Sequence, residues 1–330
     1  MIGAWMLYAV LLGGLVLLAA TPVERLVREA GGPTRRIWTA ALLATVLAPV
    51  LGMLLKDSAA AVEVGDRLVV DSPSAGIVME GVDALAVLDS ILLSGWAIAS
   101  TLLLSVLVGG LAATSLASRR WHRETVDGVP VLISRDVGPA VIGVHRSKIV
   151  LPRWSLALEP EQRAMMLRHE QEHLRAGDPG LLLFIALVVA LMPWNPAAWY
   201  AAARARLAIE VDCDRRVLGT RNPDLRGYAE LLLSVGARQS RLAYGVGFSV
   251  GRPFLEERID RMTAPRRRTS RLQVALLTVG LLGVVGAAWA VPQPVRAAKI
   301  GHIAVPMCPD EGGSTTGLST EMLSELGRAG

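Results

Sequence analysis

Long apolar runs separated by charged segments dominate the hydrophobic and polar pattern of this chain. Four of the runs lie at residues 4–20, 37–55, 90–117 and 272–291. A transmembrane helix needs about 20 consecutive apolar residues, so each run predicts one membrane span. The first arginine, Arg25, follows the first run and no basic residue precedes it. A secretory signal peptide has the opposite order, and we therefore expect this span to be retained.

A fifth apolar stretch, residues 180–203, is interrupted by the sequence Pro-Trp-Asn-Pro at 193–196. As a helix, residues 181–192 would extend only about 18 Å, which is short of a hydrocarbon core of about 30 Å. The two prolines favour a turn at the interruption. The stretch therefore predicts a re-entrant helical hairpin that returns the chain to the side from which it entered.

Residues 124–152 show a different pattern, with short runs of β-branched residues. Turns are expected at Gly128-Val129-Pro130 and at residues 135–139. This small sheet either offers an exposed edge to which a substrate strand adds, or is a plain structural cover. The predicted fold is a mainly α membrane protein with about four transmembrane helices, a re-entrant helical hairpin and a small α+β domain.

Composition and charge agree with this class and predict an orientation. Of 330 residues, 52% are hydrophobic and 19% charged. The loop 56–89 is acidic, whereas basic residues flank the other ends of the predicted spans. These basic residues are Arg25, Arg28, Arg35, Arg36, Arg119, Arg120, Arg123, Arg266, Arg267, Arg268 and Arg271. By the positive-inside rule, the domain 118–271 is cytoplasmic, and the N-terminus and the tail 292–330 lie outside.

This orientation divides the chain into four parts and accounts for its charge. Residues 1–117 form a membrane region with three spans, the domain 118–271 includes the hairpin 180–203, and the last span, 272–291, leads to the tail. The net charge of +5 then reflects membrane orientation. No basic groove is recognisable, so we expect a lipid bilayer as a partner but no direct contact with nucleic acid.

Candidate chemistry is concentrated at residues 169–173, which read His-Glu-Gln-Glu-His. Residues four apart lie on one face of a helix, so His169 and His173 can present two imidazoles to one metal ion. Glu170 can then act as the general base toward a water that the metal polarises. This is the H-E-x-x-H arrangement of zinc proteases. The alternative is a pair of exposed histidines, which accounts neither for Glu170 nor for the acids further along the chain.

A catalytic zinc needs three protein ligands and an open position. Glu210 and Asp214 lie four apart on a helix expected at 197–218, which suits Glu210 as the third ligand and Asp214 as a carboxylate that holds a histidine N–H. Alternatively, both acids pair with nearby arginines on a solvated face. Cys213, between them, is expected to be a small buried residue, and it cannot pair with Cys308 of the outside tail.

In combination, these motifs resemble the membrane metallopeptidases of the BlaR/MecR antibiotic-sensor family, peptidase family M-fifty-six. The resemblance is carried by the motif at 169–173, Asp178, Asn195-Pro196, the run Glu210 to Asp214, the segment from Gly138-Pro139 to Pro152, and the order of the spans. It implies His169, His173 and Glu210 as zinc ligands and Glu170 as the general base. It also implies Asp214 and Asp178 as carboxylates that support the ligands from behind.

The resemblance further implies a function. It predicts a gluzincin-like zinc endopeptidase in the bacterial inner membrane, with one zinc per chain, that takes part in signal transduction. Its substrate would be a cytoplasmic protein, such as a winged-helix repressor or the enzyme itself. The family's antibiotic sensors carry a Ser-x-x-Lys motif in an outer penicillin-binding domain, and residues 292–330 contain none. A β-lactam sensor is therefore not expected, and the stimulus and a homodimeric state are left open.

Two other classes are compatible with parts of the pattern. A site-two-type intramembrane protease would take its third ligand from Asn222-Pro223-Asp224, but Arg168 and Arg175 flank the histidine motif and disfavour burial in a transmembrane helix. A non-catalytic membrane regulator would need no general base, and Glu170 argues against it.

Overall fold

The structure is a computed structural model that describes four continuous stretches of the chain, residues 2–63, 81–219, 224–242 and 252–263. All of them belong to one compact unit, Met1–Pro294. The helices are α1 (Ile2–Glu29), α2 (Thr34–Glu63), α3 (Gly81–Ser118), α4 (Pro160–Ala176), α5 (Asp178–Leu191), α6 (Pro196–Val217), α7 (Leu225–Leu242) and α8 (Arg252–Thr263). The strands are β1 (His122–Val126), β2 (Val129–Ser134), β3 (Ala140–Ile142) and β4 (Lys148–Pro152). The predicted span 272–291 and the tail 292–330 lie outside the described stretches.

Three helices are long and apolar enough to cross a membrane, which confirms the first three predicted spans. The qualifying segments are Ile2–Glu29, Thr34–Leu51 and Val87–Ser118. The helices α1, α2 and α3 are longer than the predicted apolar runs, because each also includes helical turns that contain polar residues. The helices α4 and α5 pass the same test only as a pair, bent by 66° between them.

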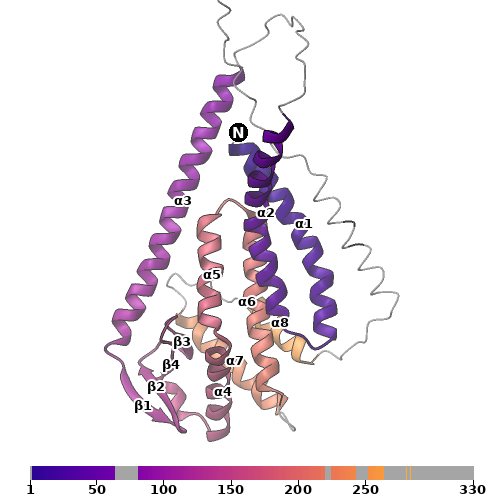
Figure 1. Ribbon diagram of the computed structural model, residues 1–330. Coiled ribbons are helices and arrows are strands. Elements are labelled where there is room, and N and C mark those ends of the chain that lie inside the picture. Colours follow the sequence, from indigo (N-terminus) through magenta and orange to yellow (C-terminus); the bar gives the residue numbers. More distant parts are fainter. Residues whose placement is uncertain are drawn as a thin grey trace, which may run out of the picture. The chain divides into compact units, whose positions relative to one another are not determined.

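The helices α1, α2, α5 and α6 pack around an apolar core (Figure 1). A row of buried alanines on α6 faces the other helices, and small side chains of this kind allow helix backbones to approach closely. The row consists of Ala198, Ala201, Ala202, Ala205 and Ala208. Its largest fully buried neighbour is Trp38 of α2. This packing fixes α6 against the membrane-spanning helices.

The predicted hairpin at 180–203 is present as α5 and α6, which pack against each other (Figure 1). At the turn the buried Asn195 accepts hydrogen bonds from the backbone N–H groups of Ala197 and Ala198 and so caps α6. The indole N–H of Trp96, on α3, donates to the carbonyl oxygen of Leu191 at 2.7 Å. The helix α6 continues past residue 203 to Val217, and this length brings Glu210 back to α4.

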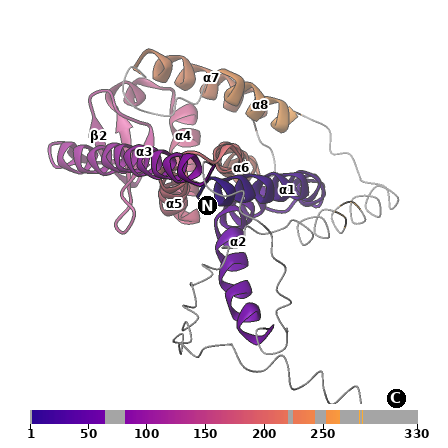
Figure 2. The same ribbon diagram turned by 90° about the horizontal axis from the view of Figure 1, so that it is seen from above.

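The small sheet has the strand order β1-β2-β4-β3, with a parallel β2–β4 pair in the middle. The first turn lies at Asp127-Gly128, both with positive φ, and not at the predicted 128–130, because Val129 and Pro130 belong to β2. Buried residues of β2 and β4 pack with α4 and α7 in a second apolar core. Figure 2 shows α7 and α8 on one side of α4 and α6, with α5 on the other.

Candidate metal centre

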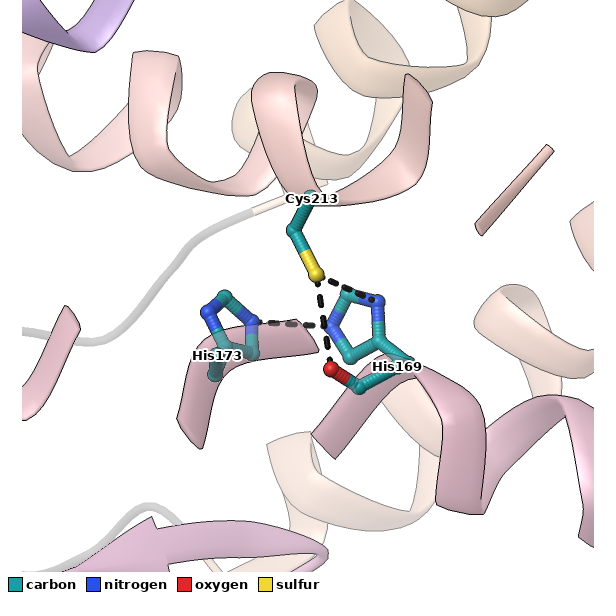
Figure 3. Close-up of side chains that lie close together, drawn as sticks. All are labelled: His169, His173 and Cys213. Atoms are coloured by element: carbon teal, nitrogen blue, oxygen red, sulfur yellow. Dashed lines mark hydrogen bonds between the residues drawn. The ribbon is translucent and has the colours of Figure 1, made fainter. Parts of the chain in front are cut away.

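His169 and His173 lie one turn apart on α4, and their rings converge (Figure 3). Their Nε2 atoms are 3.1 Å apart, and the ring planes are nearly perpendicular, at 87°. Both residues are almost fully buried. The helix therefore directs two imidazole nitrogens toward one point, as the spacing of the motif predicts.

Behind His173, its Nδ1 atom is 2.8 Å from Oδ2 of Asp178. A carboxylate can only accept, so in the neutral imidazole Nδ1 carries the hydrogen and Nε2 keeps its lone pair. Asp178 reaches this position because Gly177 ends α4 in the left-handed conformation, with φ 69°, and the chain bends into α5. The structure thus places Asp178 directly behind the predicted ligand.

Behind His169, Tyr228 of α7 is interposed between the imidazole and Asp214. The tyrosine Oη lies 2.8 Å from His169 Nδ1 and 2.8 Å from Asp214 Oδ1, whereas His169 Nδ1 and Asp214 Oδ1 are 3.6 Å apart. Burial and the Asp214 carboxylate raise the pKa of Tyr228 well above its ordinary value. The protonated hydroxyl donates to Asp214 and accepts from Nδ1, which leaves Nε2 free. Asp214 therefore supports His169 through a tyrosine that the sequence did not reveal.

Glu210 approaches both histidines from α6. Its Oε2 is 3.6 Å from His169 Nε2, and its Oε1 is 3.7 Å from His173 Nε2. Ligand atoms that lie about 2.0–2.1 Å from one tetrahedral zinc are roughly 3.3 Å from each other. The observed separations of 3.1 to 3.7 Å bracket this value. The three side chains fit a zinc-sized ion in both donor chemistry and spacing.

The cation paired with the two acids of α6 is Arg258, on α8. It donates from Nε and Nη2 to Asp214, at 2.9 and 2.7 Å, and its Nη1 is 3.1 Å from Glu210 Oε2. Burial alone would raise the pKa of Glu210, but the charge of Arg258 and the bond to His169 lower it well below its ordinary value. The alternative that both acids pair with nearby arginines on a solvated face is wrong, because their partner is a buried arginine 44 residues from Asp214.

Cys213 is fully buried, as predicted, but it also belongs to the site. Its Sγ lies 3.4 Å from His169 Nδ1 and 3.4 Å from the His169 carbonyl oxygen (Figure 3). One possible ligand atom from each of His169, His173 and Cys213 lies within 4.8 Å of the other two. The structure therefore offers two candidates, Glu210 and Cys213, for a third ligand.

The remaining motif residues have separate environments. Glu170 is buried beside the two histidines of α4, and burial raises its pKa above the ordinary value. Asp224, the third ligand of the site-two-type alternative, is exposed and accepts the backbone N–H of Gly227 at 2.9 Å. It caps the start of α7. Glu170 is thus buried next to both histidines, while Asp224 has a structural role.

Tyr228 and Arg258 were missed because no local motif marks them. Tyr228 has the helical spacing of an apolar face with Leu231 and Leu232, and all three are buried in the second core. That spacing by itself indicates core packing. Arg258 stands among other charged residues of a polar helix. Only the packing of α7 and α8 against α4 and α6 reveals either residue as part of the site.

Comparison with known proteins agrees with this geometry. The family described as BlaR1 peptidase M56 matches residues 5–261, and the chain therefore belongs to this family of membrane metallopeptidases. The chain is also 28% identical over 144 residues to the regulatory protein BlaR1 of Bacillus licheniformis. That alignment covers 42% of this chain and 24% of the relative, so the match spans about a quarter of the relative's length. The predicted family and enzyme class are confirmed.

Proposed function

We propose that this chain is a zinc-dependent endopeptidase that holds one zinc ion with His169, His173 and Glu210. The observation that carries the proposal is the convergence of two imidazole Nε2 atoms, 3.1 Å apart, on the Glu210 carboxylate. Each imidazole is held from behind by a polar group, Asp178 or Tyr228, in the orientation that a ligand requires. A pair of ordinary surface histidines would need neither partner.

The reaction follows from the roles of these side chains. His169, His173 and Glu210 would hold the zinc ion, which when bound would act as the Lewis acid for the attacking water and the scissile carbonyl. Glu170 takes the proton of the attacking water and returns it to the leaving amine. Burial raises the pKa of this carboxyl above its ordinary value. Asp178 and Tyr228 keep the two histidines in the tautomer with a free Nε2.

The substrate site proposed for this reaction is the edge of the sheet beside α4. Among the strands that the structure describes, β3 has one neighbour, β4, and it also packs against α4. An extended peptide can add to such an edge through main-chain hydrogen bonds, which places its carbonyl groups near the histidine helix. The alternative role of the sheet, as a plain structural cover of α4, stays open beside this one.

For the biological setting, we propose a cytoplasmic protein substrate and a role in signal transduction. The distribution of arginines supports a cytoplasmic active site. The relative is named a regulatory protein, which supports a regulatory role for this chain. A winged-helix transcriptional repressor, or this chain itself, is the kind of substrate that the family resemblance implies.

Substitution of Glu170 by Gln tests the proposed chemistry. We expect Glu170→Gln to lose self-cleavage and cleavage of peptide substrates while it retains zinc, because the amide keeps the shape but cannot accept the proton. His173→Ala is the matched variant and should lose both zinc and activity. Zinc content of the detergent-purified chain and peptide cleavage are measured together. A Glu170→Gln enzyme that cleaves at the parent rate, or a parent without zinc, would contradict the proposal.

A further inference from the structure

Arg35, in the first turn of the membrane-spanning helix α2, is linked to the metal centre by an ion pair. Its Nη1 donates to Oδ1 of Asp178 at 2.6 Å, and the other oxygen of the same carboxylate is 2.8 Å from His173 Nδ1. Two successive hydrogen bonds therefore connect a side chain of α2 to the imidazole of a predicted metal ligand.

The backbone around Arg35 is fixed to the helix that carries the acids of the site. Asp212 of α6 accepts from the backbone N–H and the hydroxyl of Thr34, both at 3.2 Å, and from the backbone N–H of Arg35 at 3.0 Å. Arg215, also on α6, donates to the carbonyl oxygens of Gly31 and Gly32 at 3.0 and 2.7 Å. The start of α2 is thus held against α6, and this fixes the point from which the Arg35 side chain reaches Asp178.

The Arg35–Asp178 pair differs from an ordinary surface ion pair. The Asp178 side chain is 1% exposed and that of Arg35 is 19% exposed. A buried carboxylate that loses its cation is strongly destabilised, whereas surface pairs contribute little. A second guanidinium, that of Arg216, lies farther away, at 3.8 Å, and donates to Glu172 at 3.0 Å. Arg36, the next residue of α2, is exposed.

We propose that Arg35 is a positioning residue for the metal centre. By holding the Asp178 carboxylate, it keeps the His173 imidazole in the tautomer and orientation that metal binding requires. The inference rests on the proposed function, because it takes His173 as a ligand. It adds that a membrane-spanning helix contributes to the geometry of that ligand, so a displacement of the start of α2 would move the Arg35 side chain that holds Asp178.

The first test compares zinc affinities of the full-length chain in detergent, measured by competition with a chromophoric chelator. Loss of a group that orients a liganding histidine weakens metal binding by about 10–100-fold. We expect Arg35→Gln to weaken it by about 10-fold and Arg35→Lys to recover part of the loss, since lysine keeps the charge but not the planar fork. The matched control is Arg36→Gln, which removes a positive charge at the next residue of α2. This variant should bind zinc like the parent.

A double-mutant cycle separates positioning from a general loss of stability. If Arg35 acts through Asp178, Arg35→Gln causes no further loss of zinc affinity in the Asp178→Asn background. Additive losses, or a parent-like affinity of Arg35→Gln alone, would overturn the inference. Thermal unfolding of each variant shows whether it is folded. If Arg35→Gln does not fold, Arg35→Lys takes its place in the cycle. A parent chain without zinc affinity would instead overturn the proposed function, and this inference with it.

Discussion

At the scale of single residues, the choice of third ligand depends on which histidine nitrogen each candidate faces. Cys213 Sγ lies near Nδ1 of His169, the nitrogen already bonded to Tyr228. Glu210 instead faces the Nε2 atoms of both histidines. Carboxylate and thiolate are both acceptable zinc ligands, so donor chemistry alone does not decide between them. The orientation of the imidazoles favours Glu210.

We therefore predict that Glu210→Gln weakens zinc binding by more than about 100-fold, since loss of supporting groups alone costs about 10–100-fold. Cys213→Ser, the matched variant at the neighbouring buried position, should change the affinity by less than about 10-fold on the same scale. Chelator competition on both purified variants measures the effect. The reverse order of the two losses would identify Cys213 as the ligand.

At the scale of elements, the bend between α4 and α5 brings Asp178 to His173. Gly177 makes the bend, with φ 69°, and its backbone N–H bonds to the carbonyl oxygens of His173 and Leu174. A continuous helix would carry residue 178 past the imidazole, because positions five apart do not share a face. A helix terminus is thus part of the metal centre.

For this bend we predict that Gly177→Ala lowers the free energy of unfolding by about 1 kcal/mol, because a side chain disfavours the left-handed conformation. Nothing lies within 4 Å of the added Cβ, so the cost comes from the backbone and not from a clash. Gly177→Asn should lose less, since asparagine tolerates this conformation better. Unfolding in detergent measures both variants. An alanine variant as stable as the parent would show that the bend does not depend on glycine.

At the scale of the whole molecule, the hairpin of α5 and α6 reconciles the membrane spans with the site. The helix α6 returns along α5, so Glu210 lies beside the histidines of α4. A single crossing between residues 178 and 210 would separate the ligands by the thickness of the bilayer. The site therefore requires both ends of the hairpin on one side of the membrane, and the arginines predict that this side is the cytoplasm.

Reporter fusions test this orientation. Alkaline phosphatase is active only outside the cytoplasm, so we expect no activity after Arg123 or Arg221 and activity at Gly330. A fluorescent protein that folds in the cytoplasm, fused at the same three positions, serves as the control and should give the opposite pattern. Phosphatase activity at either of the first two positions would place the histidine helix outside and exclude a cytoplasmic substrate.

The sequence by itself determined the features that depend on local order. Hydropathy located the three spans that the structure describes, and two prolines with a short apolar segment predicted the hairpin. The four-residue spacing placed His169 and His173 on one helical face, because helical geometry is the same wherever the helix packs. The spacing of Glu210 and Asp214 made both acids candidates, and the family resemblance added Asp178. The structure brings all three to the two histidines.

Tertiary structure alone decided which side chains surround and orient these groups. Tyr228 is 59 residues from His169, and Arg35 is 143 residues from Asp178. Neither pair has a fixed spacing that a sequence pattern could express, since each contact depends on how α7 packs on α4 and how α2 packs on α6. A tyrosine on an apolar face and an arginine at the end of a span have ordinary explanations in core packing and membrane orientation. Their role follows only from the contacts that the packed helices create.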